Sequence, residues 1–272
     1  MSKKRLLSIE LNEVNFDYIK KYIELGYLPN FKELISQNKL IETFTNEKHK
    51  NLEPWINWVT ARTGKDFSEH KIFHLGEYNK KSFDQHIHKL SKNHLNVSSI
   101  ASMNSYDKYN SIYPYIPDPW SLEEPKGNFL LKNIFKVIKK NVQNNASGKT
   151  SIVTYLIMAV GVFYYGGINS LITQSKLFIK SLKSKWVKAV ILDQLLIDIY
   201  IHINKKKYFN YSSIFLNAAA HLQHHYLYNS IVINKKLNNP SWYIHKNDDP
   251  VLFIFNSYDT FIGKLINKFK DE

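Results

Sequence analysis

The run Arg5-Leu-Leu-Ser-Ile-Glu-Leu11 is a short apolar stretch that carries an acidic residue near its end. This pattern favours a buried strand of a parallel sheet that delivers Glu10 at its carboxyl end. Open α/β sheets bind their ligands at that edge, so Glu10 stands where a functional residue is expected. The first eleven residues therefore predict both an α/β protein and a candidate site residue.

Further helices and strands follow this first strand. The expected elements are helices over 14–25, 31–37 and 54–63, strands over 40–44, 97–103 and 211–217, and a proline-rich loop over 113–120. Gly26 and Gly64 are typical helix-ending residues, and Pro54 fits the first turn of a helix. We expect a mostly parallel central sheet flanked by helices.

The chain is expected to fall into three stretches. Residues 1–121 form the amino-terminal part of the α/β core, and residues 208–272 return to that core. Between them, residues 122–207 read as long helices, including one over 186–203, and predict a helical insertion.

The charge balance limits the classes of partner. The chain has 37 Lys and Arg against 23 Asp and Glu, a net charge of +14. Most of the bases are single lysines and not Arg-rich blocks, which argues against a nucleic-acid partner. The positive field favours a phosphate- or sulfate-ester substrate, an anionic glycan or an anionic membrane surface. There is no cysteine, so a metal must be held by His, Asp, Glu or Asn.

An uncharged segment over 150–175 indicates how the protein could associate with a membrane. Residues 150–175 carry no charged side chain, and 152–163 is a long apolar run. Gly166, Gly167 and polar residues interrupt its second half, which favours a buried or membrane-surface helix over a membrane span. We expect membrane association, if any, through 152–172. The amino terminus lacks an apolar signal sequence, so a cytoplasmic protein is expected, in solution or membrane-associated.

Three histidines follow the strand over 211–217. In Ala218-Ala-Ala-His-Leu-Gln-His-His-Tyr226, His221 and His225 lie four residues apart, on one face of a helix, and could bind a zinc-like ion. A hydrogen-bonded or solvated trio with His224 is the alternative. For Glu10 the alternatives are metal ligation and a strand-end acid that caps a turn or pairs with a lysine.

Three segments resemble the type I phosphodiesterase and nucleotide pyrophosphatase branch of the alkaline phosphatase superfamily. They are Ile9-Glu10-Leu-Asn-Glu13 with Gly26-Tyr-Leu-Pro-Asn30, the segment from Pro54 to Gly64, and His221-Leu-Gln-His224-His225. In that family an acid after the first strand binds a metal, a Thr or Ser at a helix start is the nucleophile, and an Asp-x-x-x-His pair supplies further ligands.

The resemblance implies roles for particular residues. Glu10 corresponds to the first-strand metal ligand and His224 to the histidine of the Asp-x-x-x-His pair, although Ala220 stands at the Asp position. The usual nucleophile position falls on Pro54, which leaves Glu53 and Thr45 as catalytic candidates. The implied metal ligands are therefore Glu10, His221, His224 and His225, with a divalent ion, zinc or alternatively manganese, as the cofactor.

The resemblance covers residues 5–105 and 208–265. It implies a metal-dependent phosphodiesterase or phosphatase-like hydrolase. The family's carboxyl-terminal third, with its Asp-His-Gly motif, has no counterpart, since the sequence contains no Asp-His dipeptide. A truncated or inactive relative is therefore also expected. The alternative is a non-catalytic module that keeps the fold and binds an anion or a membrane surface, for example in surface-glycan assembly.

Overall fold

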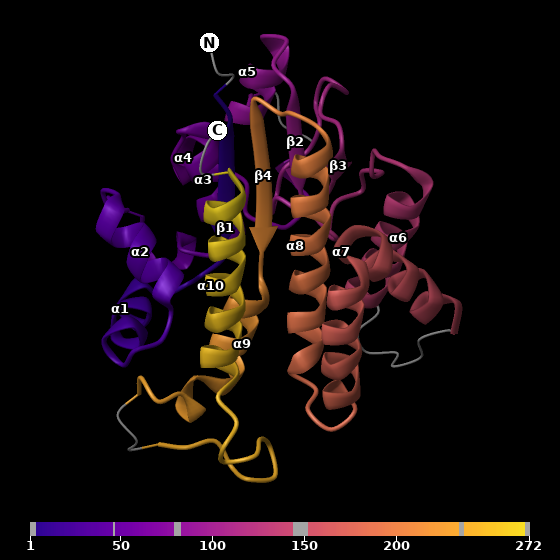
Figure 1. Cartoon of the computed structure of the whole chain (residues 1–272). Coiled ribbons are helices and arrows are strands. Elements are labelled where there is room, and N and C mark those ends of the chain that lie inside the picture. The colour runs from indigo at the N-terminus through magenta and orange to yellow at the C-terminus, as the bar shows by residue number, and fades with distance from the viewer. Residues whose placement is uncertain (1–3, 46, 79–82, 144–151, 234–236, 270–272) are drawn as a thin grey trace. The chain divides into compact units, whose positions relative to one another are not determined.

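The structure is a computed structural model that describes residues 4–45, 47–78, 83–143, 152–233 and 237–269. Within these residues, four parallel strands form one sheet in the order β1-β4-β2-β3 (Figure 1). The strands are β1 Leu6–Leu11, β2 Val97–Ile100, β3 Tyr115–Ile116 and β4 Tyr211–Leu216. Every residue of β2, β3 and β4 is buried, as is typical of parallel strands that are covered on both faces. The predicted α/β fold class is confirmed.

Two compact units make up the chain. The first contains residues 1–10, 45–171 and 198–215, and the second contains residues 11–44, 172–197 and 216–272. The helices of the first unit are α3 Pro54–Thr63, α4 Phe67–His70, α5 His86–Lys92 and α6 Phe129–Gln143. Those of the second are α1 Phe16–Glu24, α2 Pro29–Gln37, α9 Ala218–Tyr226 and α10 Pro250–Phe269. The boundaries between the units fall at 10/11 in β1, at 44/45, at 171/172 in α7 Ile152–Ser181, at 197/198 in α8 Val187–Lys206 and at 215/216 in β4.

The first unit is organised around the sheet. In the parallel register, Val97 of β2 pairs with Tyr211 of β4 and Ser99 of β2 pairs with Tyr115 of β3. Val97, Tyr115 and Tyr211 belong to a buried apolar cluster that also contains Ile87 of α5. Burial of these side chains, each stabilising by about 1.5–3 kcal/mol, anchors α5 on the sheet.

The second unit is held together by α10. This helix packs against α9 and α2, and its buried Asp259 bonds to the start of α2. The Asp259 carboxylate accepts hydrogen bonds from the Asn30 side chain and from the backbone N–H of Phe31, both at 2.7 Å. Gly263, one turn later in α10, leaves room for Asn30, because a Cβ at that position would lie 2.4 Å from Asn30 Oδ1. The start of α2 is therefore fixed by side chains from a distant part of the sequence.

Two predicted elements are wrong. Residues 40–44 alternate in the sequence but form no strand, and Leu40, Ile41 and Phe44 are exposed, since no neighbouring strand covers them. The proline-rich segment 113–120, predicted to be a loop, contains β3. Pro114 and Pro117 lie just outside this two-residue strand, where they interrupt no hydrogen bond of the sheet.

Candidate functional site

The candidate site lies in the second unit, where the ends of β1 and β4 meet the start of α9. The Asn12 amide donates a hydrogen bond to Asn217 Oδ1 at 2.7 Å, which joins the residues that follow the two strands. Gln223 of α9 donates to the backbone carbonyl of Glu13 at 2.7 Å. Glu13 has a φ of 52°, which is uncommon for a residue with a side chain. These contacts hold the turn after β1 against α9 and fix the position of the Glu13 carboxylate.

The three predicted histidines gather on α9 beside this turn. The ring centroids of His221 and His225 are 4.7 Å apart, as expected for residues four apart on one helical face. His224 Nε2 lies 2.6 Å from Glu13 Oε2, and His225 Nδ1 lies 3.2 Å from the Tyr243 hydroxyl. Burial, and then the neighbouring His225 and His224, lower the pKa of His221. The lowered pKa favours the neutral form of His221, although this residue is exposed to solvent.

A cleft of about 440 Å³ opens at the exposed end of this cluster. Its lining residues are Glu13, Asn15, Tyr18, Gln223, His224, His225, Leu227, Tyr228 and Asn239. The volume lies in the range of small-molecule sites, and the lining offers a carboxylate, two imidazoles and several amides. The cleft can therefore accept a small polar ligand.

A side chain of the protein caps the amino-terminal end of α9. Buried Asp193 of α8 accepts hydrogen bonds from the backbone N–H of Ala218 at 2.9 Å and from the Tyr258 hydroxyl at 2.5 Å. Burial raises the pKa of Asp193 to about 6, although both hydrogen bonds act in the opposite direction. Because a carboxylate of the chain already occupies this helix start, a ligand of α9 must be held by side chains and not by its first N–H groups.

Glu10 lies in the first unit and is paired with Arg62. Arg62 Nε donates to Oε1 at 3.1 Å and Nη2 donates to Oε2 at 2.5 Å, and both side chains are almost fully buried. Ser102 also donates to Oε2, at 3.3 Å, while Arg62 bonds to the carbonyl of Met103. Arg62, and not a lysine, is thus the cation that compensates Glu10. Sharing of a metal between Glu10 and the histidines stays a prediction, because these residues belong to different units.

The two nucleophile candidates are also residues of the first unit. Glu53 is exposed and precedes α3, where its backbone carbonyl accepts from Ile56 N–H while its side chain makes no capping bond. Thr45 is exposed, and its hydroxyl accepts from the backbone N–H of Glu47 at 3.1 Å. The structure groups neither residue with the histidines of α9.

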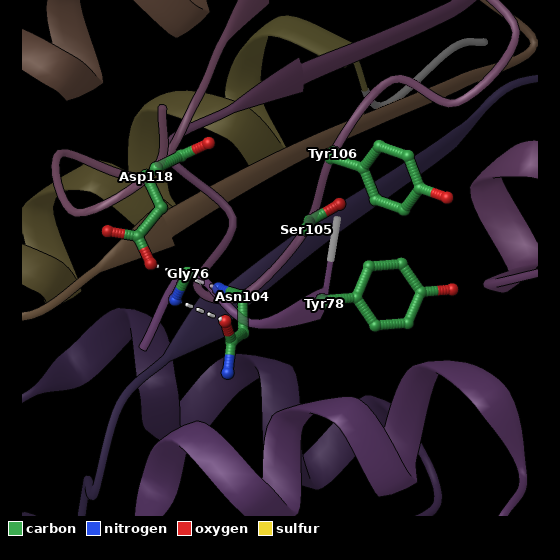
Figure 2. Close-up of a pocket in the computed structure, with 7 residues that line it drawn as sticks. Gly76, Tyr78, Asn104, Ser105, Tyr106 and Asp118 are labelled. Carbon is green, nitrogen blue, oxygen red and sulfur yellow. Dashed lines mark hydrogen bonds between the residues drawn. The ribbon is translucent and has the colours of Figure 1, made fainter. Parts of the chain in front are cut away.

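A second cavity, in the first unit, is structural. It has a volume of about 10 Å³, enough for a single water at most. Figure 2 shows that Asn104 lies at its wall: Oδ1 accepts from Gly76 N–H at 2.8 Å, and the Asn104 backbone N–H donates to buried Asp118 at 3.0 Å. The buried Ser105 Oγ, which also lines the cavity, has no hydrogen-bond partner among the described residues, and the small volume leaves no room for a substrate.

Two histidines of α9 are spaced as potential metal ligands. Among the residues that the structure describes, no three His, Asp or Glu side chains form a group that could hold a metal. The His221–His225 pair offers two nitrogen ligands on one helical face, one fewer than the three protein ligands of a typical catalytic zinc site. The two-ion site that the resemblance implies stays a prediction.

Comparison with known proteins adds no assignment: no family model, no curated protein and no solved structure matches this chain. The resemblance to the alkaline phosphatase superfamily therefore stays a prediction, and a function must be argued from the site.

Proposed function

We propose that the protein is a metal-dependent hydrolase of phosphate or sulfate esters and that the cleft beside α9 is its active site. The observation that carries this proposal is the arrangement on α9. His221 and His225 share one helical face, and His225 lines the cleft together with the His224–Glu13 pair. Two nitrogen ligands beside a carboxylate and an imidazole are the groups that metal-assisted ester hydrolysis needs.

The His221–His225 pair would hold the ion, for which zinc is the first choice and manganese the second. When bound, such an ion polarises the ester oxygens and makes a neighbouring water more acidic. The net charge of +14 draws an anionic ester toward the protein at low salt.

Glu13 and His224 supply the acid–base chemistry in this proposal. Among the described residues that line the cleft, none is Ser or Thr, so the nucleophile is water. The Glu13 carboxylate takes a proton as the water oxygen bonds to phosphorus or sulfur. The protonated His224 imidazole gives a proton to the ester oxygen that leaves as its bond to phosphorus or sulfur breaks. The 2.6 Å contact between Glu13 Oε2 and His224 Nε2 orients both side chains at the cleft.

Hydrolysis of bis(4-nitrophenyl) phosphate, 4-nitrophenyl phosphate and 4-nitrophenyl sulfate, with and without added Zn²⁺ or Mn²⁺, tests the proposal. We expect metal-dependent turnover of at least one ester, reduced to the metal-free rate in a His221→Ala/His225→Ala variant. Loss of the base in Glu13→Gln should lower kcat by about 100-fold or more. The matched control is His94→Asn, an exposed residue of the first unit at a φ of 58°, where Asn is tolerated.

The outcome also separates the hydrolase from the non-catalytic alternative. Saturable binding of a phosphodiester without turnover, lost in His224→Ala, would favour an anion-binding module that uses the same cleft. Folded, metal-supplemented protein that neither turns over nor binds these esters would contradict both uses of the cleft.

A further inference from the structure

One face of α7 is apolar and uncovered. In the part of α7 that belongs to the first unit, Ile152, Leu156, Val160 and Phe163 recur at spacings of three to four residues, and each is more than half exposed. Such spacing places them on one face of the helix. Val153, Tyr155, Ala159 and Tyr164 are also exposed, so no charged or amide side chain lies among the exposed residues from 152 to 164.

The opposite face of the same segment is packed. Val162 and Tyr165 are buried, and Gly161 lies so close to α6 that a Cβ there would be 2.5 Å from Ile134 Cδ1. At Gly166 a Cβ would lie 2.6 Å from Asp198 Oδ2 of α8. The apolar composition of the outer face therefore serves no packing within the described part of the first unit, and its exposure to water costs free energy.

The excess positive charge lies in the same part of the chain. Between Pro125 and Leu192 the sequence has eleven lysines and no Asp or Glu, whereas the rest of the chain has 26 basic and 23 acidic residues. In α6, which packs against α7 at Gly161, Lys132, Lys136 and Lys140 recur every four residues and are exposed. An apolar helix face accompanied by lysines complements a bilayer that contains anionic lipids.

The backbone of α7 favours a helix that lies on the membrane. The helix as a whole is long and apolar enough to be a candidate span. Gly167, however, has a φ of 74° and a ψ of −172°, outside the helical range, so the helix is broken there. At 1.5 Å per residue the segment 152–166 is about 22 Å long, shorter than the hydrocarbon core of about 30 Å.

We propose that this protein attaches to anionic lipid bilayers through the outer face of α7 between Ile152 and Tyr164, with the lysines of α6 beside the headgroups. The apolar side chains enter the boundary between headgroups and acyl chains, and the lysines interact with lipid phosphates. This inference does not depend on the proposed hydrolase activity, because it uses no residue of the cleft.

Flotation of the full chain with two kinds of vesicle tests the inference: pure phosphatidylcholine, and phosphatidylcholine with 30% phosphatidylglycerol. We expect binding to the anionic vesicles that weakens as salt is raised. Replacing Leu156, Val160 and Phe163 by Ser should weaken binding by about tenfold or more. The matched control replaces three other exposed apolar residues, Ile41, Phe44 and Leu122, by Ser and should bind as the wild type does.

A second variant tests the electrostatic part on its own. Changing Lys132, Lys136 and Lys140 to Gln should weaken binding to anionic vesicles by about tenfold or more and leave binding to neutral vesicles unchanged. Circular dichroism of each variant checks that the fold is kept. The inference is overturned if folded wild type floats with neither vesicle, or if the α7 variant floats as well as the wild type. It is also overturned if the α7 substitutions instead convert a self-associated wild type to a monomer, since a second copy would then cover this face.

Discussion

Arg62 and Glu10 form a two-point ion pair inside the first unit, with 3.1 Å between Nε and Oε1 and 2.5 Å between Nη2 and Oε2. The two side chains are 52 positions apart in the sequence and nearly inaccessible to water. A buried pair of this kind contributes little net stability, but removal of either partner leaves an uncompensated charge.

Loss of either partner of the Glu10–Arg62 pair should destabilise the protein. Glu10→Gln and Arg62→Met should each lower the free energy of unfolding by about 3–5 kcal/mol, because each leaves one charge buried without its partner. The double variant Glu10→Leu/Arg62→Met should lose less than the sum of the single losses. Urea unfolding followed by circular dichroism measures all three. A stable Glu10→Gln protein that has lost a bound metal would show that Glu10 acts as a ligand and not chiefly as the partner of Arg62.

Asp193 predicts a dependence of stability on pH. Burial raises its pKa from the ordinary 3.8 to about 6, so between these values the folded protein binds more protons than the unfolded chain. The stability that a protonated Asp193 provides is therefore lost as pH rises from about 4 to 6, on the order of 3 kcal/mol in all, and stays constant above that. The Asp193→Asn variant should not show this loss of stability between about pH 4 and pH 6, because Asn does not titrate.

Unfolding in urea at pH 4.5 and pH 7.5 measures the effect of Asp193. The wild type and the variant are compared at each pH, so that other carboxyl groups contribute equally to both. The exposed Asp17 provides the control variant Asp17→Asn. If the free energy of unfolding changed equally between the two pH values in the wild type and in Asp193→Asn, the role given to the buried carboxylate would be contradicted.

Gly263 predicts a steric coupling between α10 and α2. A methyl group at this position would meet Asn30 Oδ1 at 2.4 Å and displace the side chain that bonds to Asp259. Gly263→Ala should therefore destabilise the protein by about 1–3 kcal/mol. Adding Asn30→Ala removes the obstacle, so the double variant should lose less than the two single losses combined, as thermal unfolding can measure. Strict additivity would argue against this contact.

Replacing Asn104 should lower the free energy of unfolding, because its side-chain amide donates two hydrogen bonds. Its Nδ2 donates to the carbonyls of Trp55 and His74 at 3.0 and 3.1 Å. Asn104→Asp removes both donors and places a charge beside buried Asp118, which should cost about 2–4 kcal/mol in unfolding free energy. The control is Asn38→Asp, because Asn38 donates to the Leu34 carbonyl on an exposed surface. If both substitutions cost the same, the Asn104 contacts would not matter to stability.

Local signals in the sequence were sufficient for much of the fold. The runs that became β2 and β4 are read correctly because strands buried on both faces need apolar residues. The strand β1 is also placed correctly, but only Glu10 in it is buried. Gly26, Pro29, Pro54 and Gly64 mark the ends of α1, α2 and α3, since their backbone preferences act locally. A strand as short as β3 gives too few residues for a pattern.

The features that the sequence does not predict are contacts between residues that lie far apart along the chain. The sequence predicts that Glu10 binds a metal, caps a turn or pairs with a lysine, and nothing local points to Arg62 as its partner. Glu13 and Asn217 are not singled out as site residues, although Glu13 follows the first predicted strand and Asn217 ends the strand predicted over 211–217. The capping of α9 by Asp193 joins two helices whose packing only the structure gives.

Metal binding by α9 is the most direct test of the proposed active site. Protein treated with chelator and dialysed against a small excess of Zn²⁺ or Mn²⁺ is analysed for metal per chain, for the wild type, His221→Ala/His225→Ala and the control His94→Asn. We predict one ion per chain in the wild type and in the control, and none in the double variant. A folded wild type without stoichiometric metal, or a double variant that retains it, would contradict the account.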